Sequence, residues 1–507
     1  MDPNLPLYAS PGAYNWLWGY FIPIGLLMLV WAGLSPRKAR RVTGMVTTAL
    51  TLSVLGYWAV GFALHMGGAF PVTSDPALQG LDRMLPLLPG DAGWGIAGLS
   101  GFFLHGEGLT TTVYELFLTY LPLMTTAALL VTLALAHTRR GVMVVAGLLT
   151  ATVIVPIAAC WMWGSGWLAR LGSTMDLGHG FVDFGGTALL FWLPGMIVLP
   201  ILLLQPHSTG EESAVQLRSP APPRSYAPLM ANVGALLMGI GWLGWQLSGP
   251  FHVAGAVLDW QRAAINVLLG MAGAAMTSQL YAWLMLGAPE GLLAAQGLGA
   301  GWGAVLACAP FVPPWAAVSV GAVSGLLFPL VHYAISAGLK VRDAGAAVAL
   351  GLTSGPIGLL GVAVLADGRW GQGWNGVGAP GEGSTLGPGV AGLFSSGEPQ
   401  QLWAQLTGLA VLGLWGLLWG AVLGFLANPG RVKTAAVRIS RMRDAGVSSG
   451  STDESPVLAK VTPEDAPMAG DEKVSLPSNG GESDSPVSEP ETEPAIESPH
   501  SSGELES

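Results

Sequence analysis

Charged residues are scarce in this chain. Asp, Glu, Lys and Arg make up 10% of its 507 residues, whereas a soluble globular domain carries about 25%. Hydrophobic residues reach 51%, and glycine is abundant with 73 residues. Helices in a bilayer associate through small residues, because lipid gives them no hydrophobic reason to cluster. The composition excludes an ordinary soluble protein and predicts an all-α integral membrane protein.

Cysteine and the motifs of common enzymes are also scarce. Cys160 and Cys308 both fall within apolar runs, which predicts that each is a small buried packing residue. We find no P-loop, no HExxH and no G-x-S-x-G nucleophile elbow with partner residues. The sequence therefore predicts no enzymatic activity, no metal or other cofactor, and no nucleic-acid partner.

Acidic charge is confined to one end of the chain. Residues 445–507 hold 14 of the 31 acidic and 2 of the 21 basic residues, a net charge of −12, and the remaining 17 acids and 19 bases give +2. This segment is rich in Ser and Pro and nearly lacks aromatics, so we expect a disordered tail. It is either a solvated extension or a segment that docks or is phosphorylated, with a cytoplasmic regulator as a possible partner.

Long apolar stretches recur along the rest of the chain. A helix needs about 20 apolar residues to cross a bilayer, and eleven stretches meet this requirement. They are residues 15–34, 43–64, 112–136, 142–164, 183–205, 227–248, 264–286, 290–309, 314–338, 345–366 and 402–427.

Basic residues orient these spans. Of the 21 Lys and Arg residues, 17 follow odd-numbered spans or lie in the tail, and loops rich in Lys and Arg stay cytoplasmic. The sequence thus predicts a multi-pass protein of the cell membrane with residues 1–13 outside. A membrane domain (14–430), a basic cytoplasmic segment (431–444) and the tail (445–507) follow.

Four segments carry longer motifs. They are WMWGSGWL at 161–168, GHGFVDFGGTALLF at 178–191, GWLGWQLSGP at 241–250, and GLTSGPIGLLGVAVLADG at 351–368 followed by GWNGV at 373–377. Together they resemble the ammonium transporter (Amt/Rhesus) family over roughly residues 14–440. The resemblance implies two inverted five-helix repeats plus an eleventh helix, a homotrimer, and ammonium or ammonia as the solute.

The resemblance assigns a recruitment site for the cation at the outer end. Trp163 matches a tryptophan whose indole face attracts ammonium, an interaction of about 0.5–2 kcal/mol. Asp183 matches an aspartate beneath the cation, although it could equally serve as a helix cap. Trp245 replaces a phenylalanine of the outer gate, and Gly249 replaces a serine. A gapless match in the third span places Leu123 at the other gate phenylalanine.

The same alignment removes both histidines of the family pore. Phe191 stands at one position and Gly351 at the other, and neither can bind or relay a proton as imidazole does. His332 is the one histidine predicted at membrane depth, so it is a relay candidate or a helix–helix contact. His65, His179 and His252 are expected at outer span ends, as a vestibule or as solvated interfacial residues.

Two functions remain open from the sequence. The first is a channel or transporter that conducts ammonia, ammonium or another small neutral solute without a histidine relay, through an apolar pore lined by Phe191 and Gly351. The second is a non-conducting ammonium sensor or regulatory subunit with the same fold.

Overall fold

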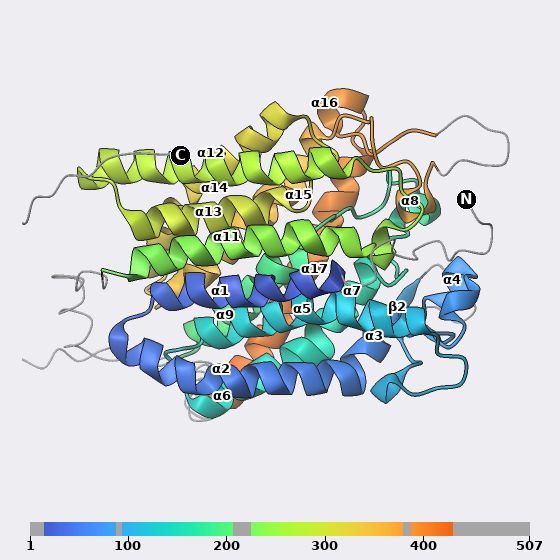
Figure 1. Ribbon diagram of the computed structural model, residues 1–507, viewed down its shortest axis with the longest axis horizontal. Helices are drawn as coiled ribbons and strands as arrows, with labels where there is room; N and C mark the ends of the chain where they lie inside the picture. Colours follow the sequence, from blue (N-terminus) through green and yellow to red (C-terminus); the bar gives the residue numbers. More distant parts are fainter. Residues whose placement is uncertain (1–14, 88–93, 206–224, 379–386, 429–507) are drawn as a thin grey trace, which may run out of the picture. The chain divides into compact units, whose positions relative to one another are not determined.

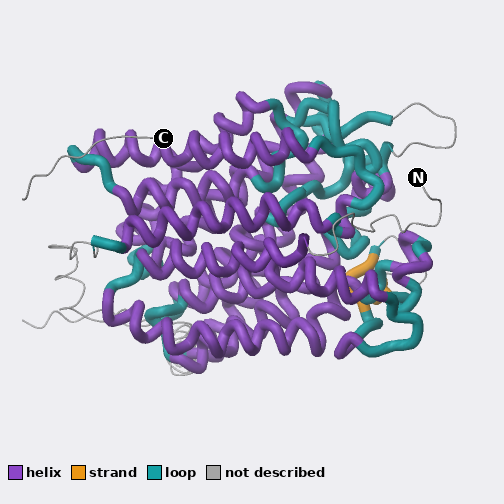
Figure 2. The backbone as a smooth tube through the Cα atoms, in the orientation of Figure 1, coloured by secondary structure: helices purple, strands orange, loops and turns teal. Residues whose placement is uncertain are grey.

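The structure is a computed structural model that describes residues 15–87, 94–205, 225–378 and 387–428. These residues form a bundle of helices with one short β-hairpin (Figures 1 and 2). Nine helical segments of the described part are long and apolar enough to cross a bilayer. Residues 1–13, the basic segment and the acidic tail lie outside the described residues, so their predicted features stay predictions.

Each of the eleven predicted spans coincides with helical structure. The first five are α1 (Phe21–Ala32) after the 3-10 turn Asn15–Tyr20; α2 (Pro36–Gly56) leading to α3 (Phe62–Met66); α5 (Thr111–Ala134); α6 (Arg140–Leu149) leading to α7 (Val155–Met162); and α9 (Leu193–Leu203). The others are α11 (Ala227–Trp245), α12 (Trp260–Leu286), α13 (Gly291–Val305), α14 (Pro314–Tyr333), α15 (Ala347–Leu365) and α17 (Gln400–Ala427). The fifth span, Ala188–Leu203, and α13 are shorter than the rest.

Four of these spans contain a π-helical turn. The turns are Tyr57–Gly61, Thr150–Ile154, Ala188–Trp192 and Ala334–Gly338. A π turn inserts one extra residue into the helical register and is often found at functional sites. The first of them opens with Tyr57 and the third contains Phe191.

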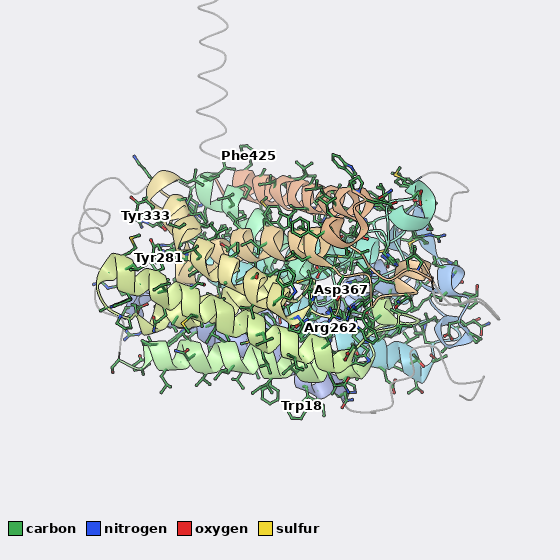
Figure 3. The ribbon with its side chains drawn as sticks, turned by 90° about the horizontal axis from the view of Figure 1, so that it is seen from above. Trp18, Arg262, Tyr281, Tyr333, Asp367 and Phe425 are labelled. Carbon is green, nitrogen blue, oxygen red and sulfur yellow. The ribbon has the colours of Figure 1, made fainter. Side chains whose placement is uncertain are left out.

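One end of the bundle carries the connections predicted to lie outside. The hairpin of β1 (Met84–Pro86) and β2 (Gly95–Gly98) gathers there with α4 (Phe70–Thr73), α8 (Leu171–Met175) and α16 (Leu393–Ser396), on the right of Figure 1. An ion pair between Arg262 and Asp367 ties the start of α12 to the loop after α15 (Figure 3). The described parts of both predicted outer loops, 65–111 and 367–401, therefore lie at this end.

Basic side chains gather at the other end. Arg37, Arg40 and Arg41 on the first turns of α2 share an open groove with Arg140, the first residue of α6. Both helices begin at the end opposite the hairpin (Figure 1). This separation agrees with the charge asymmetry on which the predicted orientation rests.

The sides of the bundle expose large apolar residues. Trp18 is 47% and Phe425 52% exposed, and both project from the bundle in Figure 3. Large apolar side chains are likewise exposed along α12 and α14. Such surfaces suit contact with lipid. Cys160 and Cys308 are both buried and free, as predicted. The fold is that of a multi-pass membrane protein.

Helices α1 and α11 approach one another at glycine. A Cβ added to Gly234 would lie 2.6 Å from the carbonyl oxygen of Gly25, and one added to Gly25 would lie 2.4 Å from the carbonyl oxygen of Gly234. Such contact between backbones gives membrane helices most of their packing energy. The first and sixth spans are held together through this pair.

A valine at Gly234 should therefore destabilise the bundle. We expect Gly234→Val to cost about 1–3 kcal/mol, the usual range for overpacking, and to lower the unfolding temperature in detergent. Gly44→Ala on α2 is the control, because a Cβ at Gly44 meets nothing within 4 Å. An unchanged unfolding temperature in Gly234→Val would contradict the close approach.

Candidate functional site

Three of the predicted recruitment residues meet at the outer end of the bundle. Trp163 follows α7, and its indole Nε1 donates to the carbonyl oxygen of Asp183 at 2.9 Å. Trp245 ends α11 and donates to the carbonyl oxygen of Thr119 at 2.7 Å. The two indole rings lie 6.4 Å apart and both are buried. Each indole is therefore buried and held in place by a hydrogen bond to a backbone carbonyl.

Asp183 serves as a helix cap. Its carboxylate accepts hydrogen bonds from the backbone N–H groups of Gly186, Thr187 and Ala188 at 2.9, 2.9 and 2.7 Å. The first N–H groups of a helix have no partner within the helix, and here the aspartate supplies one. Its own carbonyl accepts the hydrogen bond from Trp163, so this residue links the start of the fifth span to that tryptophan.

Gly249 shapes the turn after α11. Its φ is 65° and its ψ 61°, a left-handed conformation that glycine adopts without strain. Pro250 follows, and the hydroxyl of Ser248 donates to the carbonyl oxygen of Trp245 at 2.7 Å. The serine of the related motif has no counterpart at this position, and the turn instead leads the chain back to His252.

His252 lies on the indole ring of Trp163. Its ring is parallel to the Trp163 indole, with centroids 4.3 Å apart and an interplanar angle of 10°. Its Nε2 is 2.9 Å from the carbonyl oxygen of Phe184, and its Nδ1 is 2.9 Å from the hydroxyl of Tyr120. Because a carbonyl only accepts, Nε2 carries the proton and Nδ1 accepts from Tyr120. Both ring nitrogens are satisfied in the neutral form, and burial lowers the pKa of His252 to about 3.

Tyr120 completes the outer cluster, which we define as Tyr120, Trp163, Trp245 and His252. Its ring centroid lies 5.8 Å from Trp163 and 6.4 Å from Trp245. The gapless match placed the gate at Leu123, which is buried about one helical turn later on α5, and that assignment stays a prediction. Tyr120 was not named from the sequence, although an aromatic residue is closer than leucine to the phenylalanine of the family motif.

The two positions that the motif alignment pairs with the pore histidines, Phe191 and Gly351, are in direct contact. A Cβ on Gly351 would lie 2.5 Å from the carbonyl oxygen of Phe191 and 3.0 Å from the Cα of Gly195. The Phe191 ring is fully buried, edge-on to Trp302 at 5.7 Å, and a Cβ on Gly303 would lie 2.8 Å from it. The backbone of α15 thus packs on the π turn of the fifth span, and position 351 has no room for a side chain.

His332 lies elsewhere. Its Nδ1 is 3.6 Å from the carboxylate of Asp343, its side chain is 38% exposed, and its ring stacks on Phe328. Asp343 in turn accepts from the backbone N–H groups of Val348 and Ala349, both at 2.8 Å. His332 therefore joins the end of α14 to the helix cap of α15. Among the described residues, no contact connects it to Phe191 or Gly351.

The expectation of solvated histidines at the outer span ends is wrong. His65, His179 and His252 are 0%, 4% and 8% exposed. The Nε2 of His179 is 3.2 Å from the carbonyl oxygen of Pro388, and burial lowers the pKa of His179 to about 4. His179 is covered by the loop that carries Pro388 and His65 by aromatic rings of neighbouring spans, and a count of apolar residues shows neither.

Titration of His252 should be visible in the pH dependence of stability. The unfolded chain takes up a proton below pH 6.5, whereas buried His252 does so only near pH 3. Stability is therefore lost as the pH falls between these values, by about 2 kcal/mol at pH 5. The unfolding temperature of His252→Gln, which keeps a donor and an acceptor, should fall less between pH 7 and pH 5. The same fall as in the unsubstituted chain would show that His252 is not buried and neutral.

Comparison with known proteins places these features in a family. The model of the Ammonium Transporter Family matches residues 17–441. The ammonium transporter Amt2 of Archaeoglobus fulgidus is 28% identical over 363 residues, 69% of this chain and 70% of that protein. The putative ammonium transporter sll1017 of Synechocystis is 24% identical over 407 residues, 78% of each chain.

Solved structures show the same fold. Mep2 of Saccharomyces cerevisiae superposes with a TM-score of 0.63 at 18% identity, over 84% of this chain and 90% of that chain. A sensor Amt protein superposes with a TM-score of 0.59 at 19% identity, over 82% of this chain and 93% of that chain. With the sequence match over nearly the whole described bundle, these findings show that the chain belongs to the ammonium transporter family.

Proposed function

We propose that this chain transports ammonia across the membrane as a neutral molecule, without a histidine relay. The observation that carries this proposal is the contact between Phe191 and Gly351 at the two pore-histidine positions. An unpaired charge at membrane depth is unfavourable by several kcal/mol. Since neither residue can bind a proton or an ion, the species that passes them is uncharged.

Two ring contacts would close the path in the described conformation. At the outer end, His252 covers one face of the Trp163 indole at 4.3 Å, where a cation would gain from the ring. Further in, the Phe191 ring lies against Trp302 and Gly303. We infer that transport requires both rings to move, so this is a gated path in its closed state.

Orientation and assembly complete the proposal. The arginine groove of α2 and α6 would face the cytoplasm and the β-hairpin the outside of the cell membrane. We propose a homotrimer, with part of the exposed apolar surface of the bundle as the subunit contact. The acidic tail at 445–507 would then lie on the cytoplasmic side, where a regulator can reach it.

Uptake by proteoliposomes tests the transport. When ammonium chloride is added outside, the lumen should become alkaline faster than in empty liposomes, because ammonia leaves its proton outside and takes up another proton after it enters. It should produce no electrical current, because the crossing species is neutral. A current that depends on ammonium and disappears on substitution at Phe191 would contradict the proposal.

The Phe191 ring is the sharpest point at which to test the closed path. Phe191→Ala removes the ring from Trp302 and Gly303, so we expect uptake to rise several-fold while remaining free of current. Phe394→Ala is the control, because Phe394 on α16 is 77% exposed at the outer surface. Uptake unchanged in Phe191→Ala would show that no path passes this ring.

The same packing favours a second function. The crowding at position 351 would be permanent if the two repeats never separate there. The chain would then bind ammonium without conducting it and act as a receptor. Uptake no faster than in empty liposomes, together with ammonium binding measured by calorimetry, would replace transport by this function.

A further inference from the structure

His65 is a buried histidine with one unused nitrogen. It lies on α3, directly after the π turn that opens with Tyr57, and is 0% exposed. Its Nδ1 is 3.0 Å from the hydroxyl of Tyr57. Its Nε2 is buried and has no hydrogen-bond partner. A buried polar atom without a partner is unfavourable and rare, and it calls for a ligand or a water.

The surroundings of His65 are aromatic. The rings of Tyr57 and Phe117 stack at 5.5 Å, and Phe62 stands edge-on to both. On its other side, His65 lies edge-on to Tyr120, with centroids 4.7 Å apart. Tyr120 belongs to the outer cluster, so its ring separates His65 from His252 and Trp163. His65 therefore lies directly behind the outer cluster.

The hydrogen bond with Tyr57 decides which atom of His65 carries the proton. The Tyr57 hydroxyl has no other hydrogen-bond partner among the described residues, so its proton is used only if it donates to Nδ1. Neutral imidazole then carries its own proton on Nε2. The free atom is consequently a donor, and it can bind only a molecule that has a lone pair.

Ammonia and ammonium differ in this respect. Ammonia has one lone pair, whereas ammonium has four N–H donors and none, as a lysine ammonium group has donors and no acceptor. We propose that His65 Nε2–H binds ammonia and rejects ammonium, as a site for the neutral molecule behind Tyr120. This inference rests on the proposed function for its substrate. The proton that ammonium loses goes to water outside the cluster, and the nitrogen lone pair left behind accepts from His65.

Nitrogen NMR of the histidines tests this site without requiring transport. The full-length chain is labelled with 15N-histidine, placed in lipid nanodiscs and titrated with ammonium chloride at pH 6 and at pH 8. Free ammonia differs about a hundredfold between these conditions at equal total ammonium. The His65 Nε2 signal, assigned by its loss in His65→Phe, should respond to free ammonia. Exposed His105 is the internal control.

Two outcomes would overturn the assignment. A response that follows total ammonium would show that Nε2 accepts from the cation. No response at either pH would leave a trapped water only. In both cases the proposed function could still hold, because uptake is measured separately.

A transport readout separates the two claims further. Tyr57→Phe with His65→Phe removes both members of the hydrogen bond, so neither is left with a buried unpaired group. In a chain that transports, this double variant should raise the KM for ammonia several-fold and leave its unfolding temperature close to that of the unsubstituted chain. An unchanged KM with normal uptake would refute the site and leave the transport proposal intact.

Discussion

Two aspartates hold the arrangement on which every other feature depends. A helix that starts inside a membrane protein exposes N–H groups that no water can satisfy. Asp183 supplies the missing acceptors for the fifth span and Asp343 for the tenth. Phe191 and Gly351 each follow their aspartate by eight residues. The two caps thus set the depth at which these residues meet.

The contact between Phe191 and Gly351 leaves no space for a histidine side chain at position 351. A side chain at 351 would collide with the backbone of the fifth span, so the change at one position and the packing at the other belong together. The outer cluster is uncharged as well, because both nitrogens of His252 are satisfied in the neutral form. The proposed path would thus have two uncharged constrictions, which suits a neutral solute.

The sequence predicted the frame of this protein well. Eleven apolar stretches gave the helices, since hydropathy reports directly which segments can lie in lipid. The motifs also predicted that Trp163, Asp183 and Trp245 lie together, as they do, whereas the alignment of Phe191 and Gly351 with the pore histidines stays a prediction. These features depend on patterns of neighbouring residues, so they can be predicted from the sequence.

The contacts of the histidines, which decide their chemistry, could not be predicted from the sequence. The turn at Gly249 brings His252 onto Trp163, and a π turn sets the direction of the Tyr57–His65 pair. The first contact joins residues far apart in the chain, and the second depends on a helical irregularity that hydropathy does not report. His332 looked suited to a relay by depth alone, yet it lies beside Asp343 because α14 ends there.

The central claim is that uncharged packing closes the chain at Phe191 and Gly351, the positions aligned with the pore histidines of the family motifs. A density map of the full chain in a lipid nanodisc, at a resolution that shows side chains and ordered water, tests it most directly. The account predicts the Phe191 ring against Trp302, with the backbone at Gly351 touching the fifth span. A continuous file of water between residues 191 and 351 would contradict it.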